Sequence, residues 1–232
     1  MNMSVFKSHR LSRQEKLWGT GYLLFEALLM AKLLQYFNLL LPAPLPQAEV
    51  NVLFFAINFV AVLIIFRSYL RQLLLQLPEV AWNVLFVTAP GFLAYWLCNI
   101  LLSQLIISIY PNFSSINDQT IQTLVAENFP LMFLGTVILV PVAEEFLFRG
   151  LLFRGVYDHS PLMAWIGSIA LFSAIHITGY IGSESPLTLL LCFVRYIPAG
   201  VCLAGAYRLS GSLLAPILIH TMVNFVGMMS LR

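Results

Sequence analysis

Charged residues are scarce in this chain. Asp, Glu, Lys and Arg make up only 9% of its 232 residues, whereas hydrophobic residues make up 60%. Soluble domains carry about 25% charged residues, so this composition excludes an ordinary soluble protein. A mean hydropathy of +0.88 is typical of a chain that crosses a lipid bilayer several times. The formal net charge of +2 gives no sign of a nucleic-acid partner.

Cysteine is also rare, and its placement excludes two kinds of site. The three cysteines, Cys98, Cys192 and Cys202, each lie alone in an apolar segment. They show neither the CxxC spacing of a metal or redox site nor the pattern of a disulfide framework. We therefore interpret them as small buried residues.

Two further absences narrow the class of membrane protein. The apolar run that follows the basic N-terminal segment is long and has no small-residue cleavage site, which favours a retained first span over a signal peptide. The chain shows no convincing internal repeat, which disfavours a transporter built from inverted halves.

What the sequence does contain is a series of long apolar runs, each near the 20 or so residues that a helix needs to span a bilayer. We predict an all-α, polytopic transmembrane bundle of about seven spans. The spans run roughly over residues 17–41, 50–66, 80–107, 129–154, 162–177, 187–207 and 213–229. Residues 67–78 are expected to form an amphipathic extension, and the polar residues 111–128 a loop with a short interfacial helix.

The placement of Lys and Arg predicts a cytoplasmic N-terminus. With seven spans, one side of the membrane receives Lys7, Arg10, Arg13, Lys16, Arg67, Arg71, Arg154 and Arg208. The loops on the other side hold Glu49, Asp118, Glu127 and Glu184, with only the terminal Arg232 as a cation. Cytoplasmic loops carry the excess of Lys and Arg in membrane proteins.

Three charges inside the fourth span are the most unusual feature. A charged side chain near the bilayer centre costs about 2.5–3.5 kcal/mol on insertion scales, so such groups usually face a bundle interior and carry function. Glu145 and Arg149 are four residues apart and form a favourable pair on one helical face. Glu144 points about 100° away, which leaves it free to act as a general base. Alternatively, all three charges serve only to tie helices together.

Later spans contain further polar side chains: His176 in the fifth span, and His220 and Asn224 on one face of the seventh. With Glu144, this set supports activation of water. Glu144 would remove a proton while His176 holds the water, and His220 and Asn224 would donate hydrogen bonds to the oxyanion. The same two His and one carboxylate can instead bind Zn²⁺ through Glu144, His176 and His220, although the HExxH spacing is absent.

Arg195 lies about eight residues into the sixth predicted span. Two interpretations stay open for it, a salt bridge within the bundle and a contact with a substrate carboxylate.

Three ordered motifs resemble those of the CPBP family, the CAAX prenyl endopeptidases and bacteriocin-processing or self-immunity proteins also called Abi proteins. The motifs are Glu144-Glu145-x-x-x-Arg149, Phe172-x-x-x-His176 and His220-x-x-x-Asn224. The resemblance covers residues 129–232. It predicts a catalytic helix core there, preceded by transmembrane helices and a polar loop over residues 1–128.

The resemblance implies a cavity near the cytoplasmic leaflet and endoproteolysis of a peptide. It assigns water activation to Glu144 with His176 as its partner, and oxyanion binding to His220 and Asn224. Glu145 and Arg149 would orient the site, together with Phe172 of the second motif. The family is described both as metal-dependent and as glutamate-dependent. We favour the metal-free mechanism, because it gives Asn224 a direct role.

The predicted function is therefore that of an integral-membrane endopeptidase acting on a peptide or membrane-associated protein. Alternatives are a non-proteolytic self-immunity or scaffold protein of the same family, and a small-molecule or ion carrier. The family resemblance, together with the small size of the chain, implies a bacterial plasma membrane, where protein prenylation is not expected. This favours leader or signalling peptides over CAAX proteins as substrates.

Overall fold

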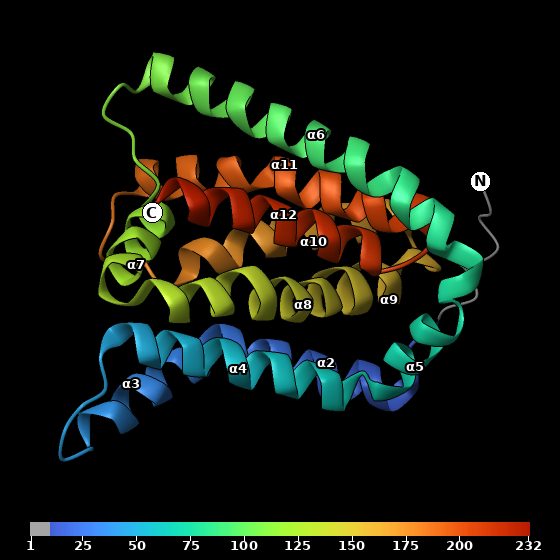
Figure 1. The fold of residues 1–232 in the computed structure, drawn as a ribbon, viewed down its shortest axis with the longest axis horizontal. Coiled ribbons are helices and arrows are strands. Elements are labelled where there is room, and N and C mark those ends of the chain that lie inside the picture. Colours follow the sequence, from blue (N-terminus) through green and yellow to red (C-terminus); the bar gives the residue numbers. More distant parts are fainter. Residues whose placement is uncertain (1–9) are drawn as a thin grey trace.

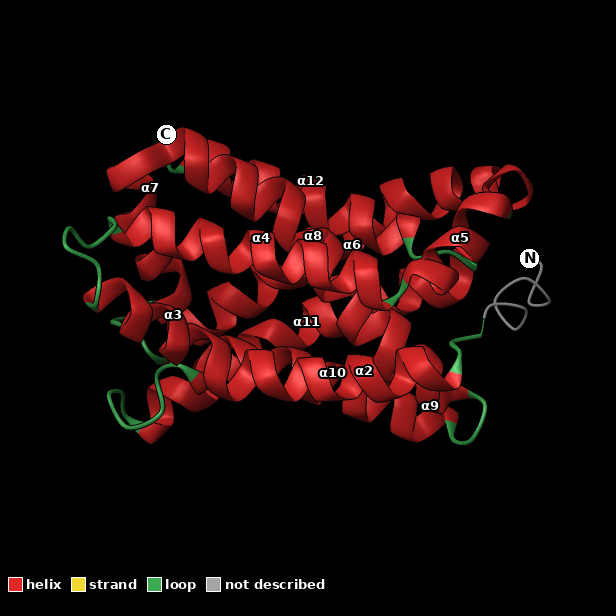
Figure 2. Cartoon of the chain, turned by 90° about the horizontal axis from the view of Figure 1, so that it is seen from below, coloured by secondary structure: helices red, strands yellow, loops and turns green. Residues whose placement is uncertain are grey.

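The computed structural model describes residues 10–232, and it is a bundle of long helices (Figure 1). No strand occurs among these residues. Loops gather at the two ends of the bundle (Figure 2), as they do when helices run across a membrane. The prediction of an all-α polytopic bundle is confirmed.

The N-terminal part of the described chain supplies two antiparallel spans, a short connecting helix and one very long helix. These elements are α2 (Arg13–Phe25), η1 (Glu26–Met30), α3 (Ala31–Leu39), α4 (Gln47–Ile65), α5 (Arg67–Leu75) and α6 (Leu77–Ile109). The first three form one continuous span, in which η1 is a π-helical turn. Short α5 corresponds to the predicted amphipathic extension.

The remaining elements carry all three motifs. They are α7 (Ile116–Leu134), η2 (Gly135–Leu139), α8 (Val140–Glu145), η3 (Phe146–Phe153), α9 (Arg154–Tyr157), α10 (Pro161–Thr178), α11 (Pro186–Ser210) and α12 (Leu214–Ser230). The run from α7 to α9 is almost unbroken helix that contains two π-helical segments, η2 and η3. Such segments are frequent at functional sites.

Six of the described helical segments are long and apolar enough to cross a membrane. The seventh predicted span corresponds to α12, an apolar helix of 17 residues. The prediction of about seven spans therefore agrees with the helices that are present. The division of the chain into residues 1–128 and 129–232 stays a prediction.

The helical run over residues 129–157, which carries the first motif and is called the motif helix below, is separated from the polar segment before it at Asn128. Helix α7 begins after Ser115, whose side chain accepts a hydrogen bond from the backbone N–H of Asp118. At Asn128 the backbone leaves the helical region, with φ −153° and ψ 85°. The Asn128 side chain then accepts from the N–H of Leu131, as an N-cap does. The predicted interfacial helix and the fourth span are thus separate helices joined at Asn128.

The ends of the described chain lie at opposite ends of the bundle (Figure 1). One end, here called the basic end, carries the start of α2, helix α5, helix α9 and the turn between α11 and α12. Its cations are Arg10, Arg13, Lys16, Arg67, Arg71, Arg154 and Arg208. Lys7, which is predicted to lie on the same side, falls outside the described residues. The end away from these cations is called the acidic end below, because Glu49, Asp118, Glu127 and Glu184 lie there.

Helices α10 and α11 approach each other closely at Gly200. A Cβ atom built on Gly200 of α11 would lie 3.2 Å from Cα of Ile169 on α10. Because backbone cannot move aside as a flexible side chain can, a larger residue here would push the two helices apart. This close approach holds α10, which carries His176, against α11, which carries Tyr196.

Candidate active site

The core of the site is the buried ion pair between Glu145 and Arg149. Nη1 of Arg149 lies 2.9 Å from Oε1 of Glu145, and both side chains have no exposed surface. The pair follows from helical spacing, because residues four apart meet on one face. Nη2 of Arg149 also donates to the backbone carbonyl of Ala199 on α11, at 3.4 Å. The arginine therefore links the motif helix to α11.

Phe172 supports this pair from α10. The guanidinium of Arg149 lies over the Phe172 ring, 4.3 Å from its centroid, which is a cation–π arrangement. The Phe172 side chain is buried and also packs edge-to-face against Phe148. Its backbone carbonyl accepts a hydrogen bond from Nδ1 of His176 at 2.8 Å. The second motif thus combines a ring that holds Arg149 with a carbonyl that holds His176.

His220 reaches the pair from α12. Its Nδ1 lies 3.0 Å from Oε1 of Glu145. A carboxylate only accepts hydrogen bonds, so Nδ1 of His220 carries a proton and donates it to this bond. Glu145 therefore joins Arg149 and His220, two groups on different helices. Its second oxygen, Oε2, has no hydrogen-bond partner.

Glu144 faces the two histidine rings without bonding to either directly. Its Oε1 lies 4.0 Å from Nε2 of His176, and its Oε2 lies 3.9 Å from Nε2 of His220. The Glu144 side chain keeps 19% of its surface exposed, in contrast to the fully buried Glu145. The structure thus separates two adjacent carboxylates into one that is paired and one that faces an open space.

Asn224 meets the motif helix one turn further along α12. Its Nδ2 donates to the backbone carbonyl of Thr136 at 2.8 Å, within η2. An amide nitrogen has two protons, so one N–H remains for a group in the cavity. The Thr136 hydroxyl is buried and has no hydrogen-bond partner.

These side chains line a cavity of about 430 Å³. All four residues predicted to carry the chemistry lie on its wall: Glu144, His176, His220 and Asn224. A volume in this range suits a small ligand or a short peptide segment. The structure therefore brings the three motifs to one cavity, although they are up to 80 residues apart in the sequence (224 − 144).

Arg195 of α11 lines the same cavity. Its Nη1 is 2.5 Å from Oδ2 of Asp118 on α7, and the Asp118 side chain is 54% exposed. Of the two interpretations left open for Arg195, the salt bridge within the bundle is the one that forms here. Contact with a substrate carboxylate stays a prediction.

Tyr196 is a site residue that the sequence patterns did not indicate. Its ring stacks on the imidazole of His176, with centroids 3.9 Å apart and planes 24° apart. It also lines the cavity. Tyr196 follows Arg195 in an apolar segment. Its position beside this charged residue is the one sequence signal that could have indicated a role in the site. Stacking and the Phe172 carbonyl together set the orientation of His176.

Replacing Tyr196 with Leu is expected to lower the rate of peptide cleavage about 2- to 10-fold. The reason is that His176 would lose a ring contact of the kind that contributes about 0.5–1.5 kcal/mol. Tyr196→Phe keeps the ring and should cleave at nearly the wild-type rate. The measurement is kcat for both variants. Equal rates for the Leu and Phe variants would show that stacking does not position His176.

Glu144, His176 and His220 are ligand types that zinc prefers, but their spacing does not suit a zinc ion. Both Nδ1 atoms donate to acceptors. In their neutral forms the two rings would therefore turn the Nε2 lone pairs of His176 and His220 toward Glu144, as metal-binding histidines require. Two ligands of a tetrahedral zinc ion stand about 3.4 Å apart, but the distances here are 3.9 and 4.0 Å. Within residues 10–232 no group of three or more His, Cys, Asp or Glu fits a metal ion. Metal binding stays a prediction.

One comparison with known proteins finds a family model that matches part of the chain. The family model described as type II CAAX prenyl endopeptidase Rce1-like matches residues 126–226. These residues contain all three motifs, and the resemblance predicted from the motifs is confirmed. Neither a curated protein nor a solved structure matches the chain.

Proposed function

We propose, from the Rce1-like domain at residues 126–226, that this membrane protein is an endopeptidase that hydrolyses a peptide bond with water activated by Glu144 and His176. Membership of a protease family supports peptide hydrolysis in general. The observation that carries the finer proposal is the position of Glu144. It is a largely buried carboxylate that faces two imidazole Nε2 atoms at 3.9–4.0 Å across the cavity.

The protonation of His176 determines how water is held. Because Nδ1 donates to a carbonyl, Nε2 of the neutral ring is an acceptor. A separation of 4.0 Å between Nε2 and Oε1 of Glu144 is too long for a direct hydrogen bond. A water molecule that bridges them would give one proton to each. Its lone pairs would then be free to attack a carbonyl carbon.

The reaction then follows from proton transfer at Glu144. As the water oxygen bonds to the carbonyl carbon, its proton passes to Glu144, which acts as general base. When the carbon–nitrogen bond breaks, Glu144 returns this proton to the leaving amine. The products are a carboxylic acid and an amine, and Glu144 is restored to its ionised form. The acid then passes its remaining proton to the amine or to solvent, which gives the carboxylate.

His220 and Asn224 are proposed to bind the oxyanion. In this role Nε2 of His220 must carry a proton, and its Nδ1 already donates to Glu145. His220 would therefore act as an imidazolium, whose charge is balanced by the two glutamates at its two nitrogens. The free N–H of Asn224 supplies the second donor. Preorganised donors of this kind each contribute about 2.7–4 kcal/mol to the transition state.

The substrate is proposed to be a peptide or a membrane-associated protein, and the location a bacterial plasma membrane. Leader or signalling peptides remain favoured over prenylated proteins. No contact among the described residues favours the self-immunity, scaffold or carrier alternatives over hydrolysis.

The direct test is incubation of the purified protein, in lipid nanodiscs, with a mixed-sequence peptide library analysed by mass spectrometry. The expected result is cleavage at a preferred sequence that His220→Ala lowers by about 10²- to 10³-fold, as loss of an oxyanion donor does. A zinc chelator should leave the wild-type rate unchanged under the metal-free mechanism. Loss of cleavage on chelation, with recovery on adding Zn²⁺, would instead establish the metal-dependent form.

A further inference from the structure

The cavity extends from the proposed catalytic residues, Glu144, His176, His220 and Asn224, toward only one end of the bundle. At its inner limit lie Glu144 and His220, in the middle of their helices. At its outer limit lie Asn117 near the start of α7 and Ser230 at the end of α12. Both of these residues belong to the acidic end, where the C-terminus lies (Figure 1). His176, in the last turn of α10, is also near that end.

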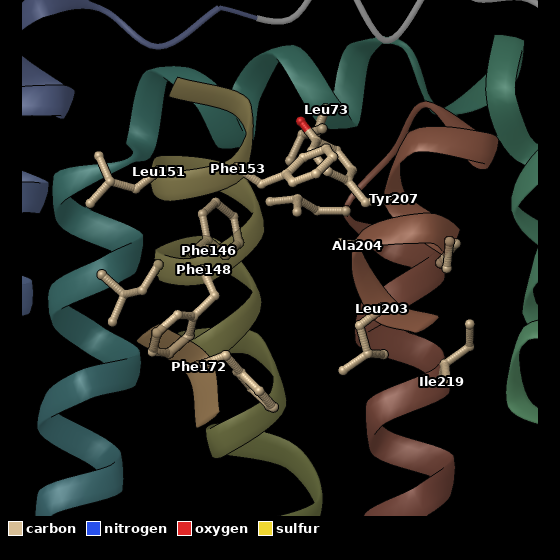
Figure 3. Packing of buried hydrophobic residues seen from close by; sticks show 14 of the residues in the cluster. Leu73, Phe146, Phe148, Leu151, Phe153, Phe172, Leu203, Ala204, Tyr207 and Ile219 are labelled. Atoms are coloured by element: carbon tan, nitrogen blue, oxygen red, sulfur yellow. The ribbon is translucent and has the colours of Figure 1, made fainter. Parts of the chain in front are cut away.

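The path from Glu144 to the basic end is filled by large side chains. Phe146, Phe153, Tyr207 and Leu213 are each at most 2% exposed. Figure 3 shows Phe153 and Tyr207 packed beside Leu73 of α5, with Phe146 below them toward the site. A second, smaller cavity lies at the basic end, but it shares no lining residue with the first. The interior is therefore closed on this side.

The mouth at the acidic end is built from polar contacts. Asp118 pairs with Arg195, which joins α7 to α11. Thr120 of α7 forms a 2.9 Å hydrogen bond with the hydroxyl of Tyr180, in the turn after α10. These bonds hold the interfacial part of α7 beside the opening. A polar, solvent-accessible rim of this kind suits the entry of a peptide backbone better than the entry of a lipid chain.

The charges at the two ends indicate which end faces the cytoplasm. Seven Lys or Arg side chains within residues 10–232 belong to the basic end. The acidic end holds four carboxylates, on α4, on α7 and in the loop before α11, and its cations are Arg195, which pairs with Asp118, and the terminal Arg232. An excess of Lys and Arg in short loops marks the cytoplasmic side. The mouth of the cavity is consequently at the end that faces away from the cytoplasm.

From the direction of the cavity and the placement of Lys and Arg we infer that the cavity opens to the extracytoplasmic side of the membrane. Its substrate is then an exported peptide or the extracytoplasmic segment of a membrane-anchored protein. This differs from the cavity near the cytoplasmic leaflet that the family resemblance implies. The statement about substrate rests on the proposed function. The statement about the opening does not, because it depends only on lining residues and charge.

The opening is tested by cysteine labelling in intact cells, with a maleimide that does not cross membranes. Single cysteines are introduced at Asn117 and Ser230 at the mouth, and at Ser68 as the matched exposed position on α5. The background variant carries Ala at Cys98, Cys192 and Cys202. Asn117→Cys and Ser230→Cys should label in intact cells, and Ser68→Cys only after permeabilisation.

The reverse pattern, or labelling of all three positions in intact cells, would overturn the inference. A second pair of variants tests the cavity itself. Thr136→Cys, on the cavity wall, should react from outside with a small charged methanethiosulfonate, whereas Ser173→Cys, which is buried in the same bundle but does not line the cavity, should not. Reaction of Thr136→Cys only after permeabilisation would also contradict the proposal.

Labelling does not depend on catalysis, so it can succeed for a protein that cleaves nothing. Failure of the proposed function and failure of the inferred opening are therefore distinguishable. If both hold, peptides added outside sealed cells should be cleaved, and the same peptides expressed in the cytoplasm without an export signal should remain intact. Cleavage of the cytoplasmic peptides alone would contradict the inferred substrate class.

Discussion

Glu144→Gln is expected to lower the rate of peptide cleavage by about 10²- to 10⁴-fold, which is the usual contribution of a general base. Glutamine has nearly the same shape but cannot accept the proton of the attacking water. The measurement is kcat on the peptide that the library identifies, with the variant and the wild type in the same nanodiscs. Equal rates would contradict the proposed mechanism.

The variant should fold normally, which makes the result interpretable. Oε2 of Glu144 has no hydrogen-bond partner, and the nearest histidine nitrogens are 3.9–4.0 Å away. The thermal unfolding temperature of the Glu144→Gln variant is therefore expected to match that of the wild type. Glu184→Gln is a suitable control, because Glu184 is exposed in the loop before α11. That variant should cleave at the wild-type rate.

The same substitution separates the proposed enzyme from the non-proteolytic alternatives. A self-immunity or scaffold protein would keep its protective effect in cells that carry Glu144→Gln, provided that the protein remains abundant. If protection instead depends on a cleaved product of the endopeptidase, cells that carry Glu144→Gln would lose the protective effect. Proteoliposome flux measured on the same variant addresses the carrier alternative.

Arg149→Ala is expected to be the most destabilising single change in the site, with a loss of about 3–5 kcal/mol in the free energy of unfolding. Removing one partner of a buried ion pair leaves the other charge buried without compensation. Here Glu145 has no exposed surface, and its Oε2 already lacks a hydrogen-bond partner. The measurement is equilibrium unfolding in mixed micelles. Arg71→Ala, at an exposed position on α5, should change stability by less than about 0.5 kcal/mol.

A double variant tests whether the pair serves stability or orientation. Replacing Glu145 and Arg149 together by Met removes both buried charges, and such replacements are often neutral or stabilising. Stability should therefore recover substantially relative to Arg149→Ala. Cleavage should not recover, because Nδ1 of His220 loses its acceptor on Glu145. Recovery of both properties would show that the pair has no role in orienting the site.

Sequence patterns alone determined the elements of this protein and part of its site. Apolar runs predicted the helices, because each must satisfy its backbone hydrogen bonds inside a membrane. The spacing of four residues predicted that Glu145 pairs with Arg149, and the pair forms. The break near Asn128 was also predictable, since a polar segment ends there and an apolar run begins. All of these are properties of one helix or one segment.

Relations between helices were decided only by the tertiary structure. The sequence could not show that Glu145 also holds His220, that Asn224 bonds the Thr136 carbonyl, or that Tyr196 stacks on His176. It also did not indicate that the cavity leads to the acidic end. The physical reason is that helical periodicity sets which side chains share a face, whereas packing sets how far each helix is rotated and shifted against its neighbours.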